Sequence, residues 1–374
     1  MKKYFFFAAI AAIGLASCSS DETIASQATN ESNEISFRPL NNGMTRATSL
    51  DITSLQSSGF YVTATFTSGH TAYFADQLYK EETSNVWKPY TGGAFTHIYW
   101  PTGSDVLDFH AYAPADHDTQ LNVSNSNVTS LNGCPEYTVE PAVSASSQID
   151  FIYATLTGKD QNDGSLPLTF GHMESQVGIK LSNTDGALIF TVSEVSICNV
   201  VESGVFKYRT TPSSGMAWGD FGGLDEYAQT GLSITKDGVQ SATDAGTTWI
   251  LIPHTLAKPT TDSQYASSSD GAAYEGAYIK VKYKCQNKTD NSYYAGGAET
   301  WVEGIWPIST NASATTWASG THYTYTIDLK GGGYYETNKA DTDAGLDRIL
   351  NLNEITFATV TVSDWTPSNS TVGM

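Results

Sequence analysis

The chain has 374 residues and a formal net charge of −20, from 39 acidic and 19 basic side chains. An acidic surface repels nucleic-acid phosphates and anionic headgroups, so this balance argues against nucleic acid as a partner. Charged residues make up only 16% of the chain, while glycine (32) and tyrosine (21) are abundant. This composition is typical of an extracellular β protein.

The amino terminus predicts a lipoprotein signal peptide. Two lysines precede an apolar run over residues 4–15, which is shorter than the roughly 20 residues of a membrane-spanning helix and matches a secretory signal. The run ends in Leu-Ala-Ser-Cys at residues 15–18, a lipobox that predicts lipidation of Cys18. The alternative is an ordinary cleaved signal with an incidental cysteine at that position.

A short strand pattern stands alone after the signal. Residues 19–33 are polar and read as a solvated tether, and Ile35 and Phe37 then alternate with polar residues until Pro39 stops the pattern. Residues 40–58 return to turn chemistry. The sequence therefore predicts one isolated strand ahead of the main fold.

From Phe60 onward the apolar residues recur with a period of two, which is typical of β-strands. Helical periodicity is scarce, and turn residues separate the strands as they do in antiparallel sandwiches. Three cysteines remain after Cys18, which is too few for a disulfide framework. The fold class predicted is all-β. The clearest strand patterns cover residues 60–66, 107–113, 177–181, 279–285, 323–329 and 355–362.

The length that remains after the signal and tether favours two domains, with a boundary near residues 171–176. The predicted layout has four parts. It consists of a signal peptide and lipobox (1–18), a tether with a leader strand (19–46), an N-terminal β-sandwich (47–172) and a C-terminal β-sandwich (173–374).

Catalytic and cofactor motifs are missing from the sequence. No zinc-protease, nucleophile-elbow, phosphate-loop or dinucleotide-binding pattern occurs, so no enzyme activity and no cofactor are expected. His97, His110 and His172 each lie beside apolar strand residues, which favours structural, hydrogen-bonded roles. Asp341, Asp343 and Asp347 surround a glycine in a loop. Their spacing does not meet the calcium-loop pattern, so a solvated acidic loop is favoured and no metal is expected.

Aromatic loop residues support an alternative function. Tyr293-Tyr294 and Tyr334-Tyr335 lie next to glycines, and exposed tyrosines could stack on sugar rings. A monomeric surface glycan-binding lipoprotein of a polysaccharide-uptake system is therefore the second hypothesis, and a glycosidase is the third. Tyrosine is also ordinary strand composition.

Several segments, taken in order and spacing, resemble the fimbrillin family, the subunits of Bacteroidales type V pili. The segments are WP (100–101), LDFHAYAP (107–114), QIDFIYA (148–154), LTFGH (168–172), VGIKL (177–181), GTHYTYTI (320–327) and TVSDW (361–365).

The resemblance implies two tandem transthyretin-like antiparallel β-sandwich domains and a pilus subunit that mediates cell adhesion. It also implies a precursor that travels as a lipoprotein on the outer membrane and is then cut by a protease after an arginine. The matching position lies between Arg46 and Ala47, and the mature form would enter an extracellular fimbria. Arg46 could instead be an ordinary exposed loop arginine.

A cut after Arg46 would separate the leader strand from the rest of the fold. A strand that carries Ile35 and Phe37 would fill a groove, and its loss would leave apolar side chains and unpaired backbone edges. An extended segment of another subunit could replace it in head-to-tail fashion. In the family the donor is a carboxy-terminal stretch, so the resemblance indicates residues 354–366 here. The candidate plug residues are Ile355, Phe357, Val360 and Val362. No pattern identifies the host or bacterial surface that such a fibre would bind.

Overall fold

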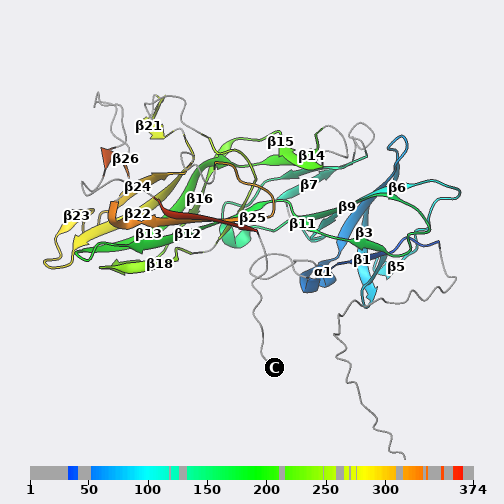
Figure 1. Ribbon diagram of the computed structural model, residues 1–374, viewed down its shortest axis with the longest axis horizontal. Helices are drawn as coiled ribbons and strands as arrows, with labels where there is room; N and C mark the ends of the chain where they lie inside the picture. The colour runs from blue at the N-terminus through cyan, green and yellow to red at the C-terminus, as the bar shows by residue number, and fades with distance from the viewer. Residues whose placement is uncertain are drawn as a thin grey trace, which may run out of the picture. The chain divides into compact units, whose positions relative to one another are not determined.

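The computed structural model shows an all-β protein, which confirms the predicted fold class (Figure 1). Among the described residues, one short α-helix, α1 (Ile52–Ser58), and two 3-10 turns, η1 (Ala145–Ser147) and η3 (Leu329–Gly331), interrupt the strands. None of the helices in this part of the chain is long and apolar enough to cross a membrane. The described residues are 33–40, 52–117, 119–125, 133–209, 215–246, 248–257, 265–268, 271–274, 276–308, 315–331, 334–335, 347–348 and 357–364.

The first large sheet, called the N-terminal sheet, has the strand order β10-β1-β4-β3-β2-β6-β9-β11, and β5 pairs with β4. Neighbouring strands are antiparallel except for β1 and β10, which are parallel. The strands are β1 (Phe37–Pro39), β2 (Phe60–Phe66), β3 (Ala72–Thr83), β4 (Val86–Thr91), β5 (Ala94–Phe95), β6 (Leu107–Ala113), β9 (Ile152–Lys159), β10 (Leu166–Leu168) and β11 (Gly171–His172).

A four-stranded sheet, called the small sheet, has the order β15-β14-β8-β7. Its two halves come from distant parts of the chain, because β14 pairs with β8 across more than sixty residues. Residues 204–208 and 216–219 therefore belong to one sheet with strands that precede residue 173, although they follow it in the sequence. The strands are β7 (Leu121–Ser124), β8 (Glu136–Val139), β14 (Gly204–Tyr208) and β15 (Met216–Gly219).

The C-terminal half forms two larger sheets. One has the order β18-β12-β25-β28, with β19 beside β12. The other has the order β16-β13-β22-β24-β26-β27, with β17 beside β13 and β23 beside β22. A separate hairpin joins β20 (Tyr265–Ser268) to β21 (Gly271–Tyr274). The first sheet contains β12 (Ser175–Asn183), β18 (Gln240–Asp244), β19 (Trp249–Leu251), β25 (Thr321–Asp328) and β28 (Phe357–Asp364). The second contains β13 (Leu188–Val201), β16 (Leu224–Gln229), β17 (Ile234–Asp237), β22 (Tyr278–Asn287), β23 (Tyr293–Ala295), β24 (Val302–Pro307), β26 (Tyr334–Tyr335) and β27 (Asp347–Arg348).

Three apolar cores hold these sheets. The C-terminal core combines buried side chains of β12 and β25 with those of β13 and β22, so the two C-terminal sheets pack face to face. The N-terminal core is formed by buried side chains of the N-terminal sheet, among them those of β1, β2 and β6, together with Leu55 of α1. The third core joins the small sheet to the other face of β6 and β9 through residues such as Tyr112 and Tyr137. Strand β22 shows the alternation most clearly, because every second side chain from Ile279 to Cys285 is buried.

Strand β6 differs from the simple alternation that its sequence suggested. Asp108, His110 and Tyr112 are almost fully buried, as are the apolar residues between them. The cause is the small sheet, which covers the face that would otherwise meet water. Burial lowers the pKa of His110 to about 4, so its ring is neutral near pH 7.

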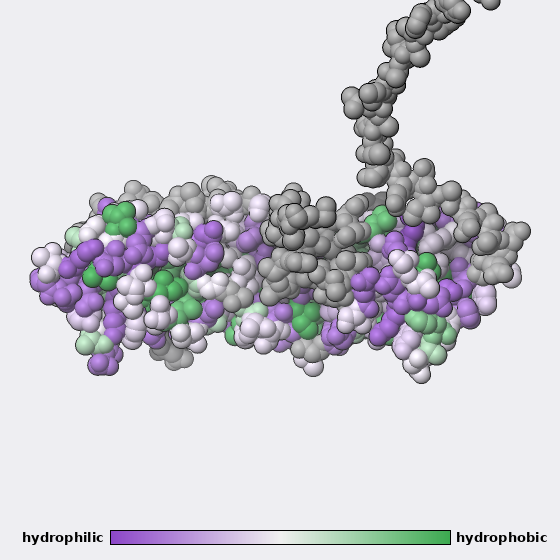
Figure 2. Space-filling view, turned by 90° about the horizontal axis from the view of Figure 1, so that it is seen from below, coloured by the Kyte–Doolittle hydropathy of each residue, from purple (hydrophilic) through white to green (hydrophobic). Residues whose placement is uncertain are grey.

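The described residues on the face drawn in Figure 2 form no large apolar patch. On the face drawn in Figure 2 the described residues are mainly hydrophilic, and the apolar ones form small separate patches. The large apolar side chains that are exposed, such as Tyr99, Leu224 and Tyr294, are scattered over different segments. Scattered exposed apolar residues are usual for a soluble protein.

Glu174 is a buried carboxyl group at the passage from β11 to β12. Its side chain has no exposed area, and Oε2 accepts a hydrogen bond from the Phe151 amide at 2.9 Å. Oε1 has no hydrogen-bond partner among the described residues. Burial, followed by the nearby Asp150 carboxylate, raises the pKa of Glu174 well above its usual value. The folded protein therefore holds this carboxyl in its protonated form more strongly than the unfolded chain does.

We predict that Glu174→Gln stabilises the protein in alkaline solution relative to wild type. The raised pKa contributes stability that is fully present below the unfolded value near 4.5 and is lost as the pH rises through the folded value. Glutamine has a similar shape and does not titrate, so its advantage should grow with pH. Urea unfolding at several pH values measures this, and an advantage that shrinks with rising pH contradicts it.

Candidate functional site in the N-terminal sheet

Residues 34–40, called the leader segment, are built into the N-terminal sheet. The segment contains β1, which runs parallel to β10 with Phe37 opposite Leu166, and antiparallel to β4 with Phe37 opposite Trp87. It belongs to the compact unit of the chain that starts at Glu34. The leader is therefore an internal strand of the sheet, with a neighbour on each side.

Backbone hydrogen bonds fix the leader along its length. The Ile35 amide donates to the Ile98 carbonyl at 2.7 Å, and the Leu40 amide donates to the Leu168 carbonyl at 2.8 Å. In the opposite direction, the Leu166 amide donates to the Ser36 carbonyl at 2.9 Å. Because buried backbone groups need partners, the loss of the leader would leave these groups on its neighbours unsatisfied.

The two apolar leader side chains lie in the N-terminal core. Ile35 and Phe37 have no exposed area. The Phe37 ring meets three aromatic rings edge-on, with centroids 4.8 Å from Tyr79, 5.4 Å from Phe109 and 6.0 Å from Phe60. Burial of each such side chain contributes about 1.5–3 kcal/mol, and the edge-to-face contacts add to it.

A charged cluster holds the amino-terminal end of the leader. One carboxylate oxygen of Glu34 lies 2.9 Å from His97 Nδ1 and the other lies 3.6 Å from Lys88 Nζ. Lys88 also pairs with Glu82 at 2.9 Å. The hydrogen bond to Glu82, supported by the charge of Glu34, raises the pKa of Lys88. The cluster therefore favours an acidic residue at the Glu34 position.

Removal of the leader would open a groove, called the leader groove, whose walls are β4 and β10. Strand β10 is at the end of the strand order, so β1 is its only strand partner among the described residues. The groove would expose the rings around Phe37 together with the unpaired edges of both walls. Such a site binds an extended peptide by strand addition, with main-chain bonds for affinity and side-chain pockets for specificity.

The other predicted site residues lie elsewhere or outside the described residues. Cys18, Arg46, Ala47 and Ile355 fall outside them. Strand β28 contains the remaining three candidate plugs and pairs antiparallel with β25 (Figure 1, red beside orange). Its register places Phe357 opposite Ile327, Val360 opposite Tyr325 and Val362 opposite Tyr323.

Residues considered for ligand binding are dispersed. Tyr293 and Tyr294 are exposed on β23, and the Asp341 and Asp343 positions lie outside the described residues. Within the described part of the chain, no three His, Cys, Asp or Glu side chains are grouped so that they could hold a metal ion. His172 pairs with Asp150 at 2.9 Å, as a structural histidine would.

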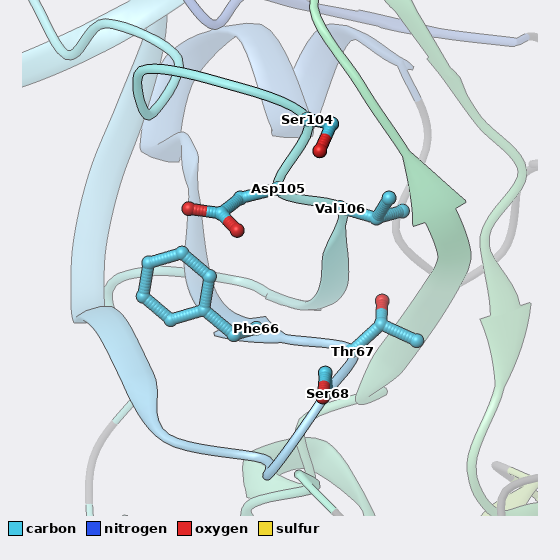
Figure 3. A pocket seen from close by; sticks show the side chains of 6 residues that line it. All are labelled: Phe66, Thr67, Ser68, Ser104, Asp105 and Val106. Atoms are coloured by element: carbon cyan, nitrogen blue, oxygen red, sulfur yellow. The ribbon is translucent and has the colours of Figure 1, made fainter.

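An open cavity of about 630 Å³ lies at the end of β2. Figure 3 shows its six lining side chains, three from residues 66–68 and three from residues 104–106. Thr67 is tied to β6 through a hydrogen bond from its hydroxyl to Asp108 at 2.7 Å. Four of its six lining residues, Thr67, Ser68, Ser104 and Asp105, are polar and exposed. The cavity is separate from the leader groove residues.

Sequence reasoning identified Ile35 and Phe37 and predicted a groove for them, but it did not identify the residues that form the groove. Leu166 and Leu168 form a three-residue strand with a proline at its centre, and so short a segment gives no periodic signal. Glu34, Lys88 and His97 meet only through tertiary pairing. The one sequence signal for this cluster was the histidine beside an apolar strand.

A family model described as fimbrillin-like matches residues 45–365. The chain belongs to the fimbrillin-like family. This finding confirms the resemblance that the segments from Trp100 to Trp365 carry. The matched region of the fimbrillin-like chain starts one residue before Arg46 and leaves the leader segment outside it. No curated protein matches the sequence.

Solved structures resemble this fimbrillin-like chain in fold. A fimbrial protein from Bacteroides vulgatus has 16% identity and a TM-score of 0.54, with 89% of this chain and 99% of that chain covered. A proposed cell adhesion protein from Bacteroides uniformis has 16% identity and a TM-score of 0.43, over 89% and 98% of the two chains. Another from Parabacteroides distasonis has 11% identity and a TM-score of 0.47, over 89% and 97%.

We predict that Phe37→Ala destabilises the N-terminal sheet by about 3–5 kcal/mol, because it leaves a cavity among three aromatic rings. Arg38→Ala is the matched control. Its side chain is exposed in the same strand and donates one exposed hydrogen bond, from Nε to the Ser165 carbonyl at 3.2 Å, so the substitution should cost less than about 1 kcal/mol. Urea unfolding followed by tryptophan fluorescence measures both, and equal losses for the two variants would contradict the assignment.

Proposed function

We propose that this chain is a structural subunit of a cell-surface pilus that mediates cell adhesion and assembles by proteolysis-triggered strand exchange. The observation that carries the proposal is the position of the leader segment, which is an internal strand of the sheet. Its only covalent link to the strands that follow is the chain segment 41–51, so one cut there separates it from them. Family membership supports the pilus assignment. The sequence contains none of the catalytic motifs named above, so the proposal includes no enzyme activity.

Export begins with the lipoprotein signal. Acyl chains on Cys18, palmitate among them, hold the precursor at the outer membrane, where each buried CH₂ contributes about 0.8 kcal/mol. The precursor faces the cell exterior, and its leader fills its own groove. Release from the membrane and activation for assembly are then one event, because the lipid and the leader both lie before Arg46.

A processing protease cuts between Arg46 and Ala47. The sequence contains four arginines, and two of the others are poorly placed for cleavage. Arg38 belongs to β1, whose backbone is paired with strands on both sides. It is also followed by Pro39, whose ring and missing N–H impede a protease. Arg209 is paired with Asp220 at 2.7 Å. The segment between Leu40 and α1 is the natural place for the cut.

After cleavage, the carboxy-terminal segment of a second subunit takes the place of the leader. Ile355, Phe357, Val360 and Val362 supply apolar side chains for the groove. The contact joins the groove of one subunit to the tail of the next, so it is head-to-tail and propagates into a fibre. An apolar C-terminal segment suits a subunit that continues the fibre.

We predict that Arg46→Ala abolishes assembly, because the leader then stays attached and keeps the groove filled. Treatment of the wild type with an arginine-specific protease should shift the amino terminus to Ala47 and produce detergent-resistant ladders on gels. Arg209→Ala is the control and should assemble normally. Ladders from the Arg46→Ala variant, or an uncleaved wild type that polymerises, would contradict the proposal.

A further inference from the structure

The tail of the chain repeats the sequence of the leader. Residues 33–40 read Asn-Glu-Ile-Ser-Phe-Arg-Pro-Leu, and residues 353–360 read Asn-Glu-Ile-Thr-Phe-Ala-Thr-Val. The tripeptide Asn-Glu-Ile occurs at these two places and nowhere else in the chain. Four of the first five residues are identical. The remaining one, at the fourth position, is serine in the leader and threonine in the tail.

Three of the four identities, at Glu34, Ile35 and Phe37, fall on side chains that the groove binds. Ile35 and Phe37 are fully buried, and the Glu34 side chain is only 7% exposed. By contrast Arg38, which the tail replaces with alanine, is exposed. Leu40 is half-buried and corresponds to a valine. The main departure is Pro39, which corresponds to Thr359.

We propose that residues 353–357 of a second copy bind the leader groove in the register that residues 33–37 occupy in the precursor. Glu354 then lies between Lys88 and His97, Ile355 fills the place of Ile35, and Phe357 enters the ring cluster of Tyr79, Phe109 and Phe60. This inference rests on the strand exchange proposed above and assigns its register and its specificity residues.

The pairing of β28 is compatible with this register. Seven register pairs join β28 to β25, from Thr321 opposite Asp364 to Ile327 opposite Phe357. Phe357 is the first residue of the strand, and a register shift separates its pair from the other six. If residues 353–357 are donated, β28 loses one register pair with β25, the one between Phe357 and Ile327. The other six pairs stay and hold the donated segment to its own subunit.

The rest of the tail fits the groove less well. An alignment of Val360 and Val362 with Ile35 and Phe37 places valine among the three rings and threonine in place of Glu34. Lys88 and His97 would then lose their carboxylate. Electrostatic complementarity sets the register of an interface, so the cluster favours the alignment with Glu354.

Cysteine cross-linking tests the register. Glu34 and Tyr99 are cross-strand partners in the precursor, at a separation that a disulfide can bridge. The variant Glu354→Cys/Tyr99→Cys should therefore give a ladder of disulfide-linked oligomers after cleavage at Arg46 and mild oxidation. Background is low, because Cys134, Cys198 and Cys285 are buried and Cys18 departs with the leader.

Two matched variants calibrate this experiment. Glu34→Cys/Tyr99→Cys should link the leader to its own subunit, so that the leader stays attached after cleavage. Thr361→Cys/Tyr99→Cys places the thiol on an exposed residue of β28 and should give no ladder. Polymer formation by each cleaved protein is followed separately by light scattering.

The outcomes separate the two proposals. Polymers of the Glu354→Cys/Tyr99→Cys variant without cross-links overturn the register and leave strand exchange standing. A cross-linked monomer overturns the assignment of the occupant to a second copy. Failure of the cleaved wild-type protein to polymerise overturns the exchange itself, and the register with it.

Charge reversal provides a second readout. Glu354→Lys brings a positive charge to Lys88 and His97, so polymerisation of the cleaved protein should slow by about tenfold or more. Asn353→Lys places the same lysine side chain at a position whose leader counterpart is exposed, and its rate should stay close to wild type. Equal rates for the two variants overturn the placement of Glu354.

Discussion

The burial of Ile35 and Phe37 between β4 and β10 is the interaction on which the rest of the N-terminal sheet depends. Among the described residues, β10 pairs with the sheet only through β1, and the three rings around Phe37 come from β2, β3 and β6. One short strand therefore connects the end of the sheet to its centre. In the assembly proposed above, this is the strand that the subunit would give up.

Cleavage at Arg46 would break no contact within the groove. It would instead lower the effective concentration of the leader at its own groove. While the leader is covalently attached, any opening is followed by rapid rebinding, because a tethered segment acts at an effective concentration in the millimolar range. A cleaved leader that leaves is diluted and does not return at that rate. The tail repeats the groove-binding residues of the leader, so the proposed exchange would replace one set of contacts with a similar set. Cleavage would then set the direction of that exchange.

The sequence predicted the parts of this arrangement that depend on local pattern. The alternation at Ile35 and Phe37, the stop at Pro39 and the period of two along β2 and β22 are properties of neighbouring residues. The pairing of β14 with β8 and the burial of both faces of β6 depend on contacts between distant segments. The periodicity of the sequence does not encode such contacts. The Glu34 cluster is of the same kind, since His97 was predicted as structural but its partner came from the leader.

Amide hydrogen exchange at β10 tests most directly whether β1 is the strand that holds this end of the sheet. The comparison is between the precursor and the cleaved chain separated from its leader peptide. The Leu166 amide, which bonds to the Ser36 carbonyl in the precursor, should be protected there and exchange rapidly in the leader-free subunit. It should become protected again in the polymer. Equal protection of Leu166 with and without the leader would contradict the account.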